Sequence, residues 1–99
     1  ERVSHDVSIV EVEGTGVPVN GDLRHRVLFL LRHSERHIVL NLARVSRIDA
    51  AGVGELVRSY NVARAAKGVL RITRVTRYVR SILKRVGLFE ILSTGRKPR

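Results

Sequence analysis

A long amphipathic segment between two short apolar runs constrains the fold of this chain most strongly. The first run, residues 37–42, contains three consecutive aliphatic side chains, and the second, residues 69–73, again reads as a strand. The intervening residues 51–67 place five apolar side chains on one helical stripe, at Val53, Leu56, Val57, Tyr60 and Ala63. Strands that alternate with helices pair in parallel through right-handed crossovers, so this order predicts a β-α-β unit whose first strand is buried on both faces.

The remaining segments extend this unit into one domain. Apolar spacing predicts further elements at residues 7–13 (strand), 17–19 (short strand) and 23–32 (helix), and a helix that Thr76 caps and Gly87 ends. The first two strands could form a hairpin. Residues 88–92 are expected to return to the core. The predicted fold class is α/β: a single mixed, largely parallel sheet of four to five strands with helices packed against it.

Residues 1–99 are expected to form this single domain, with a core at about 7–92 and a fraying basic tail at 93–99. Gly68 follows the long helix and is expected to adopt a positive φ there. Glu1 stands where an initiator Met would be, so the chain could be processed or be one domain of a longer protein. No apolar run approaches the roughly 20 residues that span a bilayer, and we expect a cytoplasmic location.

The chain carries a net charge of +10, and arginine supplies most of it. The arginines gather in the C-terminal half, at Arg58, Arg64, Arg71, Arg74, Arg77, Arg80, Arg85, Arg96 and Arg99. Such a surface attracts an acidic protein face, nucleic acid or an anionic membrane. Aromatic residues make up only 4% of the chain, which disfavours nucleic acid because bases stack on aromatic rings. Tyr78 alone is expected to be exposed, while Tyr60, Phe29 and Phe89 are expected in the core.

The sequence also argues against an enzyme. The chain has no Cys, which excludes disulfides and thiolate chemistry, and its acidic residues are scattered. The Gly52-Val53-Gly54 segment lacks the Gly-Lys that defines a P-loop. His33 and His37 are separated by Ser34, a predicted helix break, so they need not share a face. We therefore expect no catalytic residue, no cofactor and no metal site.

The turn before the long helix is the clearest candidate site. Asp49 follows Arg44 and Arg47, and its carboxylate can accept a hydrogen bond from a first-turn N–H at the positive end of the helix dipole. Gly52 and Gly54 leave the first turn bare, at a cost of about 1 kcal/mol each in helix propensity. From spacing alone, this segment fits equally well a simple helix cap and a surface that another backbone approaches closely.

Residues 38–56 resemble the core of STAS domains, the family of anti-sigma factor antagonists that also includes domains attached to sulfate transporters. The family pattern is an apolar strand ending in Asp-Leu, a loop to Asp-Ser-Ser-Gly-Leu-Gly, and a long helix. Residues 65–72 and 82–89 are also similar to family positions. The resemblance implies a mixed sheet backed by helices. It also implies binding to an anti-sigma factor, often a serine kinase, which phosphorylates a Ser or Thr at the start of the long helix and so ends binding.

This sequence departs from the pattern at the phosphoacceptor. Ala50 and Ala51 replace the two serines, and Asn41 replaces the usual Asp. Ser46 and Ser59 do not match the acceptor and are expected to be ordinary surface or loop residues. The resemblance thus implies a docking surface without its phospho-switch, formed by Arg47, Asp49, Ala50, Ala51, Gly52, Val53, Gly54, Glu55 and Arg58. A STAS domain or subunit of a membrane transport complex is the alternative, and a basic nucleic-acid-binding domain is a further one.

Overall fold

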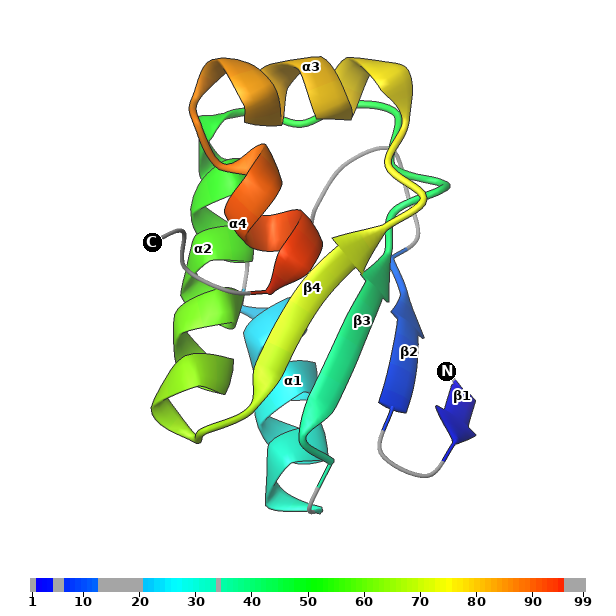
Figure 1. Cartoon of the computed structure of the whole chain (residues 1–99), viewed down its shortest axis with the longest axis vertical. Coiled ribbons are helices and arrows are strands. Elements are labelled where there is room, and N and C mark those ends of the chain that lie inside the picture. Colours follow the sequence, from blue (N-terminus) through cyan, green and yellow to red (C-terminus); the bar gives the residue numbers. More distant parts are fainter. Residues whose placement is uncertain (1, 5–6, 13–20, 34, 96–99) are drawn as a thin grey trace.

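The computed structural model describes residues 2–4, 7–12, 21–33 and 35–95. Its elements follow in the order β1 (Arg2–Ser4), β2 (Val7–Glu11), α1 (Asp22–Arg32), β3 (His37–Asn41), α2 (Ala50–Ala65), β4 (Val69–Thr73), α3 (Arg77–Arg85) and α4 (Phe89–Thr94) (Figure 1). Within these residues no helix is both long and apolar enough to cross a membrane.

The sheet has the strand order β1-β2-β3-β4. Strands β2, β3 and β4 are parallel, with Val10, Leu40 and Ile72 in register across them. The short β1 is antiparallel to β2 at the edge. These pairings confirm an α/β fold with a largely parallel sheet. The predicted strand at residues 17–19 lies outside the described residues, and the hairpin that the structure shows joins β1 to β2 instead.

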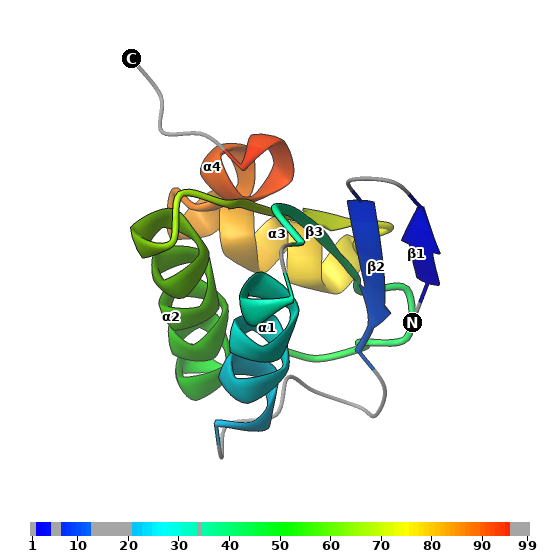
Figure 2. The same ribbon diagram turned by 90° about the horizontal axis from the view of Figure 1, so that it is seen from below.

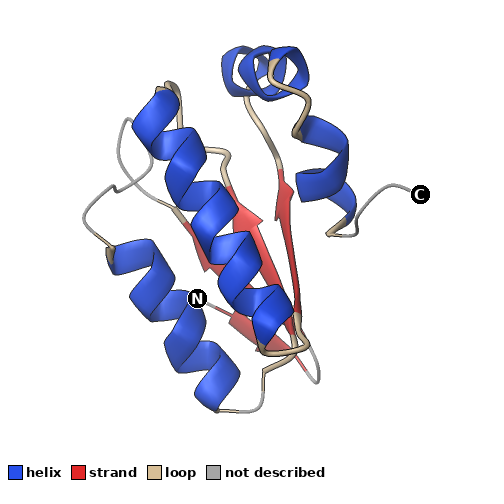
Figure 3. Ribbon diagram, turned by 90° about the vertical axis from the view of Figure 1, so that its left-hand side faces the viewer, coloured by secondary structure: helices blue, strands red, loops and turns tan. Residues whose placement is uncertain are grey.

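Helices α1 and α2 lie side by side against one face of the sheet (Figures 2 and 3). Ile38 and Leu40 on β3 join Leu30 of α1 and Leu56 of α2 in one core cluster. Val39, which alternates to the opposite face of the sheet, is also buried, so the predicted burial of this central strand on both faces is confirmed. Helix α3 crosses the end of the sheet at which the parallel strands terminate (Figure 1).

Helix α4 corrects the prediction of a fraying tail from residue 93. Ser93 and Thr94 complete this helix, which contacts β4 and buries Leu92. Gly95 ends the helix with φ 74°, and a Cβ at this position would lie 3.0 Å from the carbonyl oxygen of Leu70. The chain is thus held against β4 through Gly95. Residues 96–99 of the predicted tail lie outside the described residues.

The end of α2 differs from the prediction in which residue adopts a positive φ. Lys67 has φ 62°, while Gly68 does not lie in the left-handed region. The Gly68 N–H donates to the Ala63 carbonyl at 2.8 Å, which closes the helix in a Schellman-type turn. A Cβ on Gly68 would lie 2.9 Å from Leu31 Cδ2 and 3.0 Å from the Arg36 carbonyl oxygen. Gly68 is therefore required by close packing against the end of α1.

The prediction for Phe29 is wrong, because its ring is 58% exposed. Helix α1 buries Leu23, Val27, Leu30 and Leu31, and Phe29 lies off that stripe. Its ring stacks against His33 with centroids 4.2 Å apart. By contrast, Phe89 packs against the core, and Tyr78 is 52% exposed, as predicted.

Candidate functional site

Asp49 is the N-cap of α2, as its position in the sequence predicts. Its backbone is extended, and its Oδ1 accepts a hydrogen bond from the Gly52 N–H at 2.8 Å. Its own carbonyl oxygen accepts the first helical hydrogen bond, from the Val53 N–H at 2.9 Å. The side chain is nevertheless exposed, so Asp49 fixes the start of the helix and also faces solvent.

The loop from β3 to α2 is held by buried anchors and hydrogen bonds. Leu42, Val45 and Ile48 are buried. The Leu42 N–H donates to the Thr73 carbonyl at 3.0 Å, and Thr76 Oγ1 donates to the Val45 carbonyl at 2.9 Å. Thr76 occupies the N-cap position of α3 as predicted, but its hydroxyl serves this loop rather than its own helix. The loop backbone leading to Asp49 is therefore fixed to the β4–α3 connection.

Exposure divides the predicted docking residues into two groups. Ala50 and Ala51 are exposed on the first turn of α2, whereas Gly52 is buried and Val53 is half-buried against the core. Gly54 is half-buried. The residues exposed to a partner are Arg47, Asp49, Ala50, Ala51 and Arg58, which we call the α2 docking surface.

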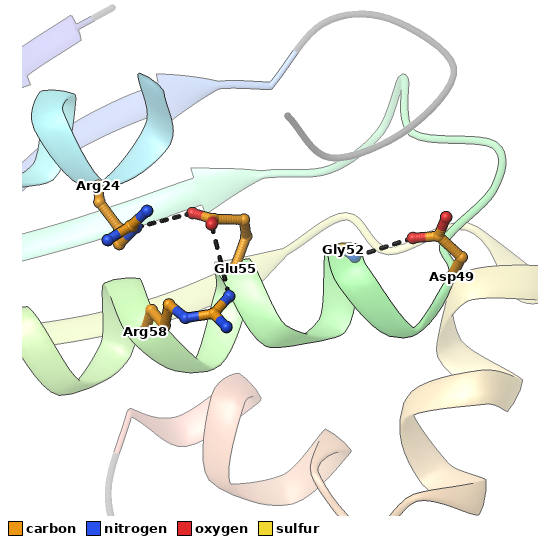
Figure 4. Close-up of polar contacts among 5 residues, drawn as sticks. All are labelled: Arg24, Asp49, Gly52, Glu55 and Arg58. Atoms are coloured by element: carbon orange, nitrogen blue, oxygen red, sulfur yellow. Dashed lines mark hydrogen bonds and ion pairs between the residues drawn. The ribbon is translucent and has the colours of Figure 1, made fainter. Parts of the chain in front are cut away.

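Glu55 does not belong to this surface as a contact residue, which corrects the prediction. It is only 2% exposed, because it faces α1 from the buried side of α2. Its Oε1 accepts a hydrogen bond from Arg24 Nε at 3.0 Å, and its Oε2 lies 3.5 Å from Arg58 Nη1 (Figure 4). Glu55 therefore acts on the surface indirectly, by holding two arginines.

The structure brings Arg24 to the site from another helix. Sequence spacing could have indicated the Arg58 contact, since residues three apart share a helix face. Arg24 lies 31 positions before Glu55, and no local pattern signals that pairing. Arg44, which the sequence does not place, is exposed on the loop that precedes α2.

Ser59 also differs from its prediction as a surface or loop serine, because it is fully buried on α2. Among the described residues its Oγ has no hydrogen-bond partner, and neither has the buried hydroxyl of Tyr60. Ser46 is exposed, as predicted. Within the same described residues, no group of three or more His, Cys, Asp or Glu side chains gathers to hold a metal ion.

Replacing Asp49 with Ala should destabilise the domain by about 0.5–2 kcal/mol, because the Gly52 N–H loses its acceptor. Asp49→Ser keeps a capping oxygen and should cost less. Urea unfolding followed by circular dichroism measures both. Equal loss of stability in the two variants would show that the Gly52 hydrogen bond contributes little.

The arrangement of a parallel sheet, a capped α2 and an exposed first helical turn is that of a STAS domain. The chain matches the STAS domain family over residues 2–98 and belongs to it. A crystal structure described as a sulfate transporter family protein from Wolinella succinogenes shares the fold, with a TM-score of 0.70. The two are 24% identical, and the match covers 97% of this chain and 79% of that one.

Proposed function

We propose that this STAS domain is a non-enzymatic protein-binding module that docks an anti-sigma factor or serine kinase partner through the α2 docking surface. The observation that carries the proposal is the pair of exposed methyl side chains, Ala50 and Ala51, directly after the Asp49 cap. Side chains this small let a partner approach the backbone of the first helical turn closely.

The support beneath this surface favours binding. Asp49 is fixed by its hydrogen bond to Gly52, and the preceding loop is fixed by Thr76. A surface that is already ordered loses little conformational entropy when a partner binds, so more of the contact energy appears as affinity. The exposed Arg47 adds positive charge to this surface, and exposed charge mainly sets the association rate and the choice of partner.

The proposal includes the absence of a phospho-switch. Ala51 occupies the family's acceptor position and has no hydroxyl, while Ser59 is buried. A phosphate would add about −1.5 to −2 charge beside Asp49 and oppose docking. We expect binding that persists in the presence of a partner kinase and ATP.

The test is incubation with a serine kinase partner and ATP, followed by mass spectrometry. The wild-type domain should stay unmodified, while Ala51→Ser should gain one phosphate and release the partner. Stoichiometric phosphate on wild-type Ser46 or Ser59, with loss of binding, would contradict the proposal.

A second candidate is a role as a domain or subunit of a membrane transport complex. It is suggested by the description of the Wolinella protein as belonging to the sulfate transporter family. Purification of the full-length gene product from its native cell distinguishes the two: a transporter subunit remains with the membrane complex, whereas an antagonist is recovered with an anti-sigma factor.

A further inference from the structure

Two guanidinium groups from different helices meet on one buried carboxylate. Arg24 comes from the first turn of α1 and Arg58 from the middle of α2, and both contact Glu55. Glu55 is 2% exposed, whereas the Arg24 and Arg58 side chains are 40% and 59% exposed. The carboxylate lies between the two arginines and contacts both (Figure 4).

Two glycines make room for these guanidinium groups. A Cβ on Gly54 would lie 3.1 Å from Arg58 Nη1, and a Cβ on Gly21 would lie 3.2 Å from Arg24 Nη2. A Cβ at either position would require the neighbouring guanidinium to shift by a few tenths of an ångström. Each guanidinium therefore lies close to a glycine backbone and also contacts Glu55.

Within the part of the chain that the structure describes, contact with Glu55 occupies only some of the donors of each arginine. A guanidinium has five N–H donors, and the contacts with Glu55 involve Nε of Arg24 and Nη1 of Arg58. The cluster of Arg24, Glu55 and Arg58 has a net positive charge, because it contains two cations and one anion. The stretch of α2 and the elements that follow it, residues 56–89, contain nine Lys and Arg residues and no Asp or Glu.

We infer that Arg24, Glu55 and Arg58 form a carboxylate receptor, in which the buried glutamate orients two arginines toward an Asp or Glu side chain of the protein partner. The inference rests on the proposed function and specifies the partner's chemistry: an acidic segment. Arg58 follows Ala51 by seven residues on the same helix face, about 10 Å along α2. The receptor is thus continuous with the α2 docking surface, which favours a carboxylate on a docked protein over a free phosphate or a lipid headgroup.

The probe is an acetylated and amidated hepta-glutamate peptide, titrated into isotope-labelled domain at low salt. We expect the Nε–H signals of Arg24 and Arg58 to shift on binding. The decisive variant is Glu55→Gln, which keeps the side-chain shape but raises the net charge from +10 to +11. General electrostatic attraction predicts tighter binding by this variant. A receptor that needs Glu55 to orient the arginines predicts binding about five- to tenfold weaker.

Two matched variants complete the experiment. Arg58→Lys retains the charge but loses the planar guanidinium that can donate two parallel hydrogen bonds to a carboxylate. We expect its loss of affinity for the peptide to be similar to that of Glu55→Gln. Arg32→Ala removes one charge from the exposed last turn of α1, and we expect a change of less than about twofold. Thermal unfolding of each variant verifies that the domain is folded. Unchanged or tighter binding by Glu55→Gln, or an equal loss in Arg32→Ala, would overturn the inference.

Inorganic phosphate, phosphatidylserine vesicles and duplex DNA serve as competing probes. If Glu55→Gln weakens the binding of any of these probes as strongly as it weakens binding of the peptide, the assignment to a protein carboxylate is wrong. The partner itself separates this inference from the proposed function. If Glu55→Gln leaves partner binding intact while Ala51→Glu removes it, the receptor fails and the docking surface stands. If Glu55→Gln weakens partner binding and Ala51→Glu does not, the proposed docking surface at Ala51 is wrong.

Discussion

Ala51→Glu should remove most partner binding, lowering affinity about 30- to 150-fold, or about 2–3 kcal/mol, while leaving the domain folded. Ala51 is exposed on the first turn of α2, so a larger side chain meets no core residue. A negative charge there even interacts favourably with the helix dipole. In a complex, however, the same carboxylate would occupy the place where the partner approaches, and it would lose its hydration.

Affinity can be measured by calorimetry with the partner recovered by pull-down. The matched control is Ala65→Glu, the same substitution at the exposed last residue of α2. It should bind like the wild type, since it lies at the opposite end of the helix. Equal affinity of Ala51→Glu and wild type would place the docking surface elsewhere on the domain.

Leu56→Ala should lower the free energy of unfolding by about 2–5 kcal/mol, a large part of the 5–15 kcal/mol typical of a whole domain. Leu56 is fully buried in the core that α2 shares with the sheet. Truncation leaves a cavity that the close-packed neighbours fill only partly. Because Leu56 follows Glu55 directly, movement of α2 would also disturb the contacts with Arg24 and Arg58.

Chemical unfolding monitored by circular dichroism tests this expectation. Val86→Ala provides the control, because Val86 is 51% exposed and its truncation should change stability by about 0.5 kcal/mol or less. A loss below about 1 kcal/mol for Leu56→Ala would mean that α2 adjusts to fill the space.

Local sequence patterns predicted the elements that position the site. The apolar run at residues 38–40 indicated the central strand. Of the five apolar residues in the predicted stripe of α2, Leu56, Tyr60 and Ala63 are buried, whereas Val53 and Val57 are half-buried. The Asp49 cap was predictable because capping depends on a side chain and a backbone N–H only three residues apart.

Contacts between distant segments could not be predicted in this way. Glu55 resembles a surface residue in sequence, and its burial depends on Arg24 across the α1–α2 packing. The sequence predicts a positive φ for Gly68, but the reason for glycine there is the close approach of Leu31. That contact joins distant segments, so the sequence pattern does not reveal it. Strand β1 was missed because it has only three residues, too few to show a period.

The connection of the α2 loop to later residues has a consequence for the order of synthesis. Leu42 and Val45, which precede the docking surface, are hydrogen-bonded to Thr73 and Thr76, which follow that surface and lie 31 positions after their respective partners along the chain. A nascent chain that ends before Thr73 contains every residue of the docking surface but lacks both of these contacts. The surface therefore acquires its final support only after the ribosome has passed α2 and β4 and reached the start of α3.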